Sequence, residues 1–540
     1  MKKQIVSIAV LALTALGLAG CAPRSQTSST SDSGKTSTTD SGKTSTSDSG
    51  SASTSTDTKT VADGIRVAYG VQDYNLVRAE VQVKSGKATS VRFDEYPMTS
   101  DHVAKSTLEE GDNVITGEVA SAWGGTNTLH QAKYFNLNGT VFTGSFANGK
   151  FTYASSTVAD YDAWAKGLTS QKDLSDLYYA IANNFVFGCD KDGNKVEGLT
   201  ATNLSKADYA SAYWPGTEKK PGTEGSRWKW NINKLEKALE GKDLDKVTVA
   251  SVKDSTGKSI TDWTVDSTST GATMTSIDAH FNLAKAAFDG TSKVVAYYNA
   301  DALASRKSNG HKDCIAKVEL VIGADNKVED AHINETVEFL DTFAASSTEP
   351  TYEHVSFTKK DKHNTESNVF EAKYMWLNGT VYTASAASSD GANYIYKNGN
   401  TEAYASIASD PYLSADFYNA AFTHHIRVAK DATASETYDA NYARKTATKA
   451  EYGCTYWNTT TANKTINGSQ WKWNINKVET SFVGKDMSQA TVAAITGKDP
   501  KTGKDKTIGW KLDDVETGAT MTEYETFAAF AKNAYAYLVK

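Results

Sequence analysis

Cysteine is scarce in this chain, and its few positions exclude several kinds of chemistry. Four cysteines occur among 540 residues, and none belongs to a Cys-x-x-Cys pair. Besides Cys21 they are Cys189, Cys314 and Cys454, an odd number that allows at most one bridge. The sequence therefore excludes a disulfide framework and gives no support for an iron–sulfur cluster, a c-type haem or dithiol chemistry.

Familiar catalytic and metal-binding motifs are also missing. The chain contains no Gly-x-Ser-x-Gly element, Walker loop, dinucleotide fingerprint or zinc-protease motif, so nothing predicts a hydrolase pocket. His424 and His425 are adjacent, and no partner recurs at ligand spacing, so we predict no metal site. A net charge of −7 without a basic stripe argues against a nucleic-acid partner.

A long apolar run is present at the start of the chain, over residues 5–18. It follows Lys2 and Lys3 and is too short for a stable membrane span, so residues 1–20 read as an export signal. Leu-Ala-Gly directly before Cys21 resembles the bacterial lipoprotein cleavage box, which implies an acylated Cys21 on the extracellular face of the membrane. The alternative is an ordinary secretory signal with an incidental cysteine.

Residues 21–60 are almost entirely Ser, Thr, Asp, Gly and Lys, and Asp-Ser-Gly-Lys-Thr-Ser-Thr is written twice, at 32–38 and 40–46. A segment without an apolar face cannot bury enough surface to fold alone. We therefore predict a disordered tether, whose root-mean-square reach would be about 35 Å.

The rest of the chain is a tandem repeat. Trp-Lys-Trp-Asn-Ile-Asn-Lys occurs at 228–234 and 471–477, and Thr-Gly-Ala-Thr-Met-Thr follows it at 270–275 and 517–522. An Ala-Lys-Tyr block at residue 132 recurs at residue 372, so the order of landmarks is fixed. Such duplication predicts two homologous domains, at 61–293 and 294–540.

Alternating and helical patterns predict the fold class of each repeat. Residues 77–93 and 315–331 read as β-hairpins with one buried face. Helical spacing appears at 173–184, at 413–422 and after each Thr-Gly-Ala-Thr. We therefore expect α+β domains, each with an antiparallel sheet and a few helices.

The Thr-Gly-Ala-Thr copies are the candidate functional sites. Thr522 and Glu525 fit a capping box, and Thr275 begins a weaker one, which predicts a helix N-terminus suited to phosphate. Glycine permits a tight turn there, and the small alanine should leave the second threonine exposed. The alternative is a loop that merely caps a structural helix. The candidate residues are Thr270, Gly271, Ala272 and Thr273, and Thr517, Gly518, Ala519 and Thr520.

Asp514 and residues 517–520 complete the pattern Asp, two variable residues, Ser/Thr-Gly-Ala-Ser/Thr. This pattern resembles the acceptor motif of FMN-binding domains, in which the last threonine carries FMN through a phosphoester installed by a flavin transferase. The resemblance implies FMN on Thr520 and, in the first repeat, on Thr273. There Ser267 takes the place of Asp514, and the nearest acid, Asp266, lies one residue earlier.

The whole layout resembles the pheromone-encoding lipoproteins of Gram-positive, flavin-based extracellular electron transfer. The resemblance implies a carrier with two covalent FMN groups rather than an enzyme with its own substrate. It would receive electrons from a membrane NADH dehydrogenase through quinone and pass them to ferric iron or soluble flavins. The alternatives are a non-redox lipoprotein that binds a ligand or cell-wall polymer, and an oxidoreductase with a small organic acceptor.

The Trp-x-Trp pairs allow two interpretations. Alternation would place Trp228 with Trp230, and Trp471 with Trp473, on one face of a strand. There they could wall a flavin ring or fill a core.

Overall fold

The computed structural model describes residues 61–299, with gaps at 110, 122–123, 184, 200–204 and 207–225, then 315–336, parts of 345–469 and 470–539. The predicted signal, Cys21 and the tether lie outside the described residues, as do Cys314, Cys454 and His424–His425. Cys189 is a buried free thiol. Residues 59–540 form one compact unit.

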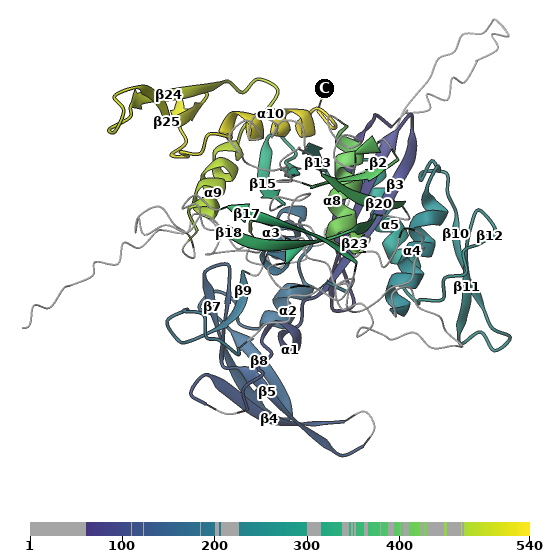
Figure 1. Ribbon diagram of the computed structural model, residues 1–540. Coiled ribbons are helices and arrows are strands. Elements are labelled where there is room, and N and C mark those ends of the chain that lie inside the picture. Colours follow the sequence, from purple (N-terminus) through teal and green to yellow (C-terminus); the bar gives the residue numbers. More distant parts are fainter. Residues whose placement is uncertain are drawn as a thin grey trace, which may run out of the picture. The chain divides into compact units, whose positions relative to one another are not determined.

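A six-stranded antiparallel sheet organises this unit, in the order β15-β14-β13-β1-β2-β3 (Figure 1). Its centre is the pair β1–β13, in which Arg66 lies opposite Val295. The two repeats thus contribute three strands each to one sheet, and both predicted hairpins are confirmed. The strands are β1 (Gly64–Gln72), β2 (Asn75–Lys84), β3 (Lys87–Pro97), β13 (Val294–Asn299), β14 (Ala316–Ile322) and β15 (Val328–Glu335).

The sheet is buried on both faces, so its strands alternate between two kinds of core. Val77, Ala79 and Val81 of β2 join the apolar cluster of the α4/α5 side. Arg78 and Glu80, between them, point to the opposite face, which α3 and α8 cover. The helices are α3 (Gln171–Ala182), α4 (Arg227–Leu239), α5 (Ile277–Phe288), α8 (Pro411–Phe422), α9 (Gln470–Phe482) and α10 (Tyr524–Tyr535).

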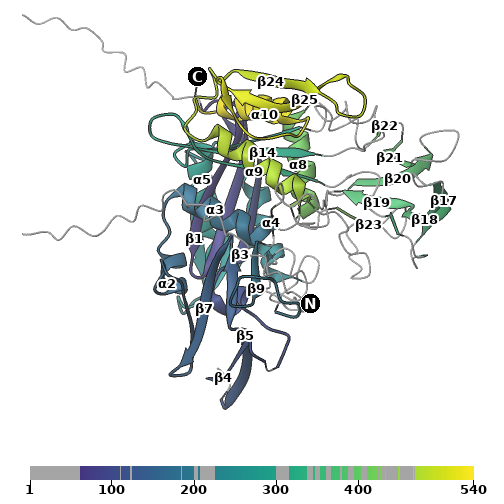
Figure 2. The ribbon, with the colours of Figure 1, turned by 90° about the vertical axis from the view of Figure 1, so that its left-hand side faces the viewer.

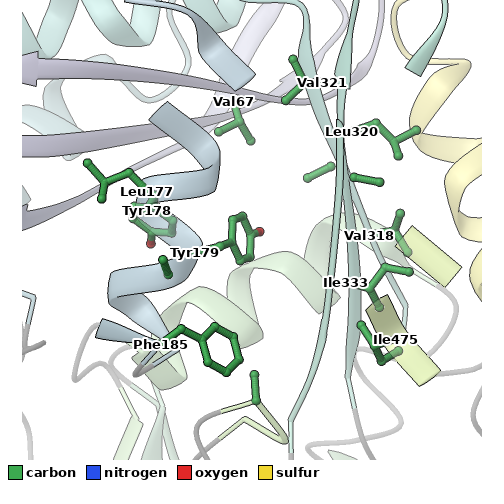
Figure 3. Close-up of a cluster of buried hydrophobic side chains, with 14 of the residues drawn as sticks. Val67, Leu177, Tyr178, Tyr179, Phe185, Val318, Leu320, Val321, Ile333 and Ile475 are labelled. Carbon is green, nitrogen blue, oxygen red and sulfur yellow. The ribbon is translucent and has the colours of Figure 1, made fainter. Parts of the chain in front are cut away.

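Each repeat covers its strands with one pair of helices. Helix α5 packs on β1 and β2 and α4 on β3, while α10 packs on β13 and β14 and α9 on β15 (Figure 2). Figure 3 shows Val318, Leu320 and Ile333 together with Ile475 of α9 on one side of the strands, and Tyr179 of α3 on the other.

Helices α3 and α8 cross from one repeat to the other. Tyr179 of α3 stacks on His332 of β15, with ring centroids 4.1 Å apart. Asn419 of α8 donates to Glu80 of β2 at 2.5 Å. Between them Arg78 pairs with both Glu80 and Glu319 at 2.7 Å, so an ion-pair cluster joins the two repeats. The repeats therefore share a core.

In the sequence of each repeat, further strands follow the strands of the large sheet and precede the helix pair, α4 and α5 or α9 and α10. In repeat 1 they form the sheets β4-β5 and β8-β7-β6-β9, and in repeat 2 β16-β18-β17 and β22-β21-β20-β19-β23. The first repeat has α1 (Ser100–Val103), β4 (Val114–Ala120), β5 (Thr126–Ala132), β6 (Tyr134–Leu137), β7 (Thr140–Ala147), β8 (Lys150–Ala154), α2 (Tyr161–Lys166) and β9 (Val186–Cys189). The second has β16 (Ala345–Ser346), β17 (His354–Lys360), β18 (Glu366–Ala372), β19 (Tyr374–Leu377), β20 (Thr380–Ala386), β21 (Tyr394–Asn398), β22 (Thr401–Glu402) and β23 (Ile426–Val428).

Two small antiparallel sheets carry the candidate site. They are β10-β11-β12 and β24-β25-β26, one in each repeat. Their strands are β10 (Val249–Lys253), β11 (Ile260–Val265), β12 (Thr268–Ser269), β24 (Val492–Lys498), β25 (Asp505–Leu512) and β26 (Val515–Glu516). The fold is α+β, as the sequence predicts.

The expectation of strands at the Trp-x-Trp pairs is wrong, because both lie in helices. Helices α4 and α9 begin after Ser226 and Ser469, whose hydroxyls accept from the backbone N–H three residues later and so cap them. Trp228 is followed at helical spacing by the buried Ile232, Leu235 and Leu239, and this longer pattern specifies a helix where the two tryptophans alone suggest a strand.

Candidate functional site

Each candidate loop closes on a tryptophan in the middle strand of its small sheet, Trp263 of β11 or Trp510 of β25. We call residues 270–274 loop 1 and residues 517–521 loop 2. In loop 1 the Thr270 hydroxyl donates to the Trp263 carbonyl at 2.8 Å, and the Trp263 indole donates to the Met274 carbonyl at 2.7 Å. Loop 2 repeats both bonds with Thr517, Trp510 and Met521, at 3.1 and 2.6 Å. The same sequence therefore builds the same loop twice.

The glycine and alanine of each loop have structural reasons. Gly271 and Gly518 both have a φ of 74°, in the left-handed region that favours glycine. The side chains of Ala272 and Ala519 are fully buried in the core beneath the loop. Thr273 and Thr520 are partly buried rather than exposed, so the alanine anchors the loop instead of clearing space around the hydroxyl.

The predicted capping boxes do not form. Helix α5 begins after Ser276 and α10 after Glu523, and neither residue makes a side-chain cap bond. Each helix thus starts one residue later than predicted. Thr273 lies four residues before the first residue of α5, and Thr520 lies four residues before the first residue of α10. Interactions other than a helix cap must therefore hold the conformation of the two loops.

One such interaction comes from a buried asparagine of the preceding helix, which the sequence analysis missed. Asn231 of α4 accepts at its Oδ1 from the N–H groups of Thr273 at 2.5 Å and Met274 at 3.1 Å. Asn474 of α9 accepts from the N–H of Thr520 at 2.7 Å. The available signal was the repeated Trp-Lys-Trp-Asn-Ile-Asn-Lys block, whose first asparagine occupies this position twice.

The tryptophans of that block divide into two kinds. Trp228 and Trp471 are buried, and their indoles donate to Glu95 at 2.7 Å and to Glu335 at 2.8 Å. Burial raises the pKa of Glu95, but a hydrogen bond with His280 and nearby positive charge lower it to about 2. These tryptophans belong to the core, one of the two interpretations considered above.

Trp230 and Trp473 are partly exposed on the same helices. The Lys234 ammonium lies 4.6 Å from the Trp230 ring centroid, and that of Lys477 lies 5.8 Å from Trp473. A side-chain carbon added at Gly271 would be only 3.2 Å from Lys234 Nζ, so this ammonium reaches loop 1. At Gly518 of loop 2 the corresponding nearest atom is Cδ of Lys477, at 3.7 Å, so only loop 1 has the ammonium itself beside its glycine.

A cavity lies beside each loop, at equivalent positions of the two repeats. Cavity 1 has a volume of about 280 Å³, and cavity 2 has about 170 Å³. Cavity 1 is lined by Lys234, Lys237, Ala238, Lys242, Val265, Thr268, Ser269 and Thr270. Cavity 2 is lined by Lys477, Thr480, Ser481, Lys485, Leu512, Val515, Glu516 and Thr517. The first lining carries three lysines and no acid, whereas the second carries two lysines and one glutamate.

The acidic residues before the loops form tight turns. Asp266 and Asp513 hold equivalent places: each accepts from a backbone N–H, of Thr248 at 3.1 Å and of Thr491 at 2.8 Å. Those bonds lower the pKa of both carboxyls. The structure thus gives Asp266 the role of Asp513 rather than that of Asp514. Ser267 and Asp514 share the next turn position, with φ values of 64° and 65°.

One other group of side chains in the described ranges has the geometry of a metal site, namely Asp176, Asp330 and His332. Burial lowers the pKa of His332, but the charges of Asp330 and Asp176 outweigh it and raise the pKa to about 9. His332 Nε2 lies 3.0 Å from a carboxylate oxygen of Asp330 and 3.8 Å from one of Asp176. Repeat 1 has Arg92 at the position of His332, so we interpret the group as an ion-pair network.

Comparisons with known proteins found no match: no protein-family model, no curated protein and no solved structure matches the chain. None of the helices in the described residues has both the length and the apolar character needed to cross a membrane. The functional conclusion therefore depends on the two loops.

Proposed function

We propose that this protein is a lipid-anchored extracellular flavoprotein that carries electrons through FMN attached by phosphoesters to Thr520 and Thr273. The observation that carries the proposal is the duplicated site: the second threonine of each loop is partly buried, and the first threonine of each loop lines a cavity together with at least two lysines. A structural cap alone would need neither the lysines nor the cavity.

The residues of the site suit a flavin phosphate. Lysine ammonium groups favour a phosphate, and the partly exposed Trp230 and Trp473 offer aromatic faces against which a flat ring could stack. Small-molecule sites usually enclose about 300–1,000 Å³. Cavities of about 280 and 170 Å³ suit a phosphate and sugar-alcohol chain rather than a whole flavin.

A bound flavin supplies one- and two-electron chemistry, and the protein supplies attachment and local charge. In our proposal a flavin transferase installs FMN, and Cys21 holds the protein at the membrane through its lipid. A membrane NADH dehydrogenase and the quinone pool would supply electrons, and ferric iron or soluble flavins would receive them. Covalent attachment suits this location, since a dissociated cofactor would be lost by diffusion.

The test is to express the mature chain with a flavin transferase and to measure its intact mass and its fluorescence after denaturation. We expect two flavin adducts, of which Thr520→Ala and Thr273→Ala each remove one and leave the other. Each variant removes one hydroxyl and one methyl group at a partly buried position, and both should still unfold in a cooperative transition. Absence of any adduct on the folded wild-type chain would falsify the proposal.

The second candidate is a non-redox surface lipoprotein that binds an anionic cell-wall polymer. Cavity 1 favours it, because three lysines without an acid in the lining would attract a polyphosphate chain non-covalently. Salt-sensitive polymer binding by a chain that gains no flavin adduct would favour this candidate.

A further inference from the structure

The two asparagines that hold the loops differ in what they bind. Asn474 is fully buried, and its Oδ1 accepts both from the backbone N–H of Thr520 at 2.7 Å and from its hydroxyl at 3.1 Å. Asn231 accepts two backbone N–H groups of loop 1, and no hydrogen bond of the Thr273 hydroxyl is recorded among the described residues. Only the second repeat thus shows asparagine holding the threonine side chain.

The orientation of the Asn474 amide is fixed from the other side. Its Nδ2 donates to the Gln470 carbonyl at 3.1 Å, one helical turn earlier, which turns Oδ1 towards loop 2. An amide oxygen only accepts hydrogen bonds, so the Thr520 hydroxyl must donate to it. The lone pairs of Thr520 Oγ1 then remain available to another group.

We propose that Asn474 is a positioning residue that holds the Thr520 hydroxyl in one rotamer, ready to attack a phosphorus atom. This inference rests on the proposed function, because it concerns the same threonine. The co-reactant it requires is a flavin phosphate activated as a phosphoanhydride, presented by a transferase.

Thr520 Oγ1 forms a bond to phosphorus, and the bond from phosphorus to the bridging anhydride oxygen breaks. The leaving phosphate departs with that electron pair, and the hydroxyl proton passes to a base of the transferase. Asn474 takes no proton, because an amide oxygen is too weak a base. It restricts the direction from which Oγ1 reacts, and such restriction of reacting groups accelerates chemistry.

The first test needs no flavin. In protein labelled at threonine methyl groups, three-bond couplings report the χ1 angle of each threonine. We expect a single rotamer for Thr520 in the wild type and averaging in Asn474→Leu. The matched control is Asn476→Ala, which removes an exposed asparagine of the same helix and should leave Thr520 unchanged. Averaging in the wild type, or one persistent rotamer in Asn474→Leu, would overturn the proposal.

The second test measures the rate of adduct formation by intact mass, with one acceptor present at a time. In a Thr273→Ala background, Asn474→Leu should slow modification of Thr520 about tenfold, as expected for a lost contribution of about 1.4 kcal/mol. In a Thr520→Ala background, Asn231→Leu should slow Thr273 less, because it removes backbone bonds only. Equal losses at both sites would show a purely structural role. A wild-type chain without adduct would instead refute the proposed function, while the couplings still decide the rotamer.

Discussion

Loops 1 and 2 are built from the same residues, yet they leave different groups available to a ligand. In loop 1 the Asp262 carboxylate accepts the Gly271 N–H at 2.7 Å, and Asn231 takes the next two free N–H groups. At the position of Asp262 the second repeat has Gly509, which has no side chain to offer.

Loop 2 consequently keeps donors that loop 1 has used. Among the described residues, the N–H groups of Gly518 and Met521 have no recorded acceptor. Unpaired N–H groups and the absence of a carboxylate favour an incoming phosphate. If the loops carry FMN as proposed, Thr520 should be the better prepared acceptor, for a reason that lies in β11 and β25 rather than in the motif itself.

The largest effect we predict concerns the core that the repeats share. Glu335 pairs with Lys449 at 2.9 Å, as Glu95 does with Lys206 in repeat 1, and all four are buried. Removing one partner of a buried pair costs about 3–5 kcal/mol. Glu335→Ala and Glu95→Ala should each lower the unfolding free energy by about that amount.

Because both pairs border one six-stranded sheet, calorimetry should show a single unfolding transition that moves in either variant. Glu329→Ala, at an exposed position of β15, serves as the control and should leave the transition unchanged. Two transitions, of which each variant moves only one, would show that the repeats unfold independently.

The sequence could predict what depends on local pattern and on duplication. The hairpins, the helices at residues 171–182 and 411–422 and the equivalence of the two loops follow from periodicity and repeated words. It could not predict that α3 and α8 cross between repeats, because such contacts depend on tertiary geometry. The difference between Asp262 and Gly509 could not be predicted for a related reason. Each lies nine residues before the glycine of its loop, and only the fold brings Asp262 to the Gly271 N–H.

The second prediction concerns substitutions that exchange Asp262 and Gly509 between the two repeats. Gly509→Asp should place a carboxylate near the Gly518 N–H and slow adduct formation at Thr520 about tenfold, the effect of about 1.4 kcal/mol. Asp262→Gly should accelerate it at Thr273. A side-chain carbon at Gly509 meets its nearest neighbour, Ile495, at 3.4 Å, so the substitution fits. Gly509→Ala is the control, and an equal slowing by alanine would mean that bulk, not charge, matters.

The third prediction concerns pH and the pair His332 and Arg92. The pKa of His332 is raised from 6.5 to about 9, so its contribution to folding is complete below pH 6.5. As the pH rises towards 9 the folded state loses that proton, and stability should fall. His332→Arg keeps the positive charge, as Arg92 does in repeat 1, and should flatten the dependence in urea unfolding measured from pH 6 to pH 10. A wild type whose stability is constant over this range would contradict the assigned charge.

The smallest predicted effect concerns the cavity linings. Lys237 and Ser269 of cavity 1 correspond to Thr480 and Glu516 of cavity 2, so cavity 1 should attract phosphate more strongly. Exposed charges contribute about 0.2–1 kcal/mol each. Lys237→Thr should therefore weaken binding of inorganic phosphate to unmodified protein about twofold, and Glu516→Ser should strengthen it at cavity 2 by a similar factor. Chemical-shift titrations with phosphate would measure the affinity of both variants at low and at high salt, and screening should reduce both changes in affinity at high salt. If the changes in affinity persist at high salt, shape rather than charge distinguishes the two cavities. The electrostatic difference between the repeats then lies in the loops alone.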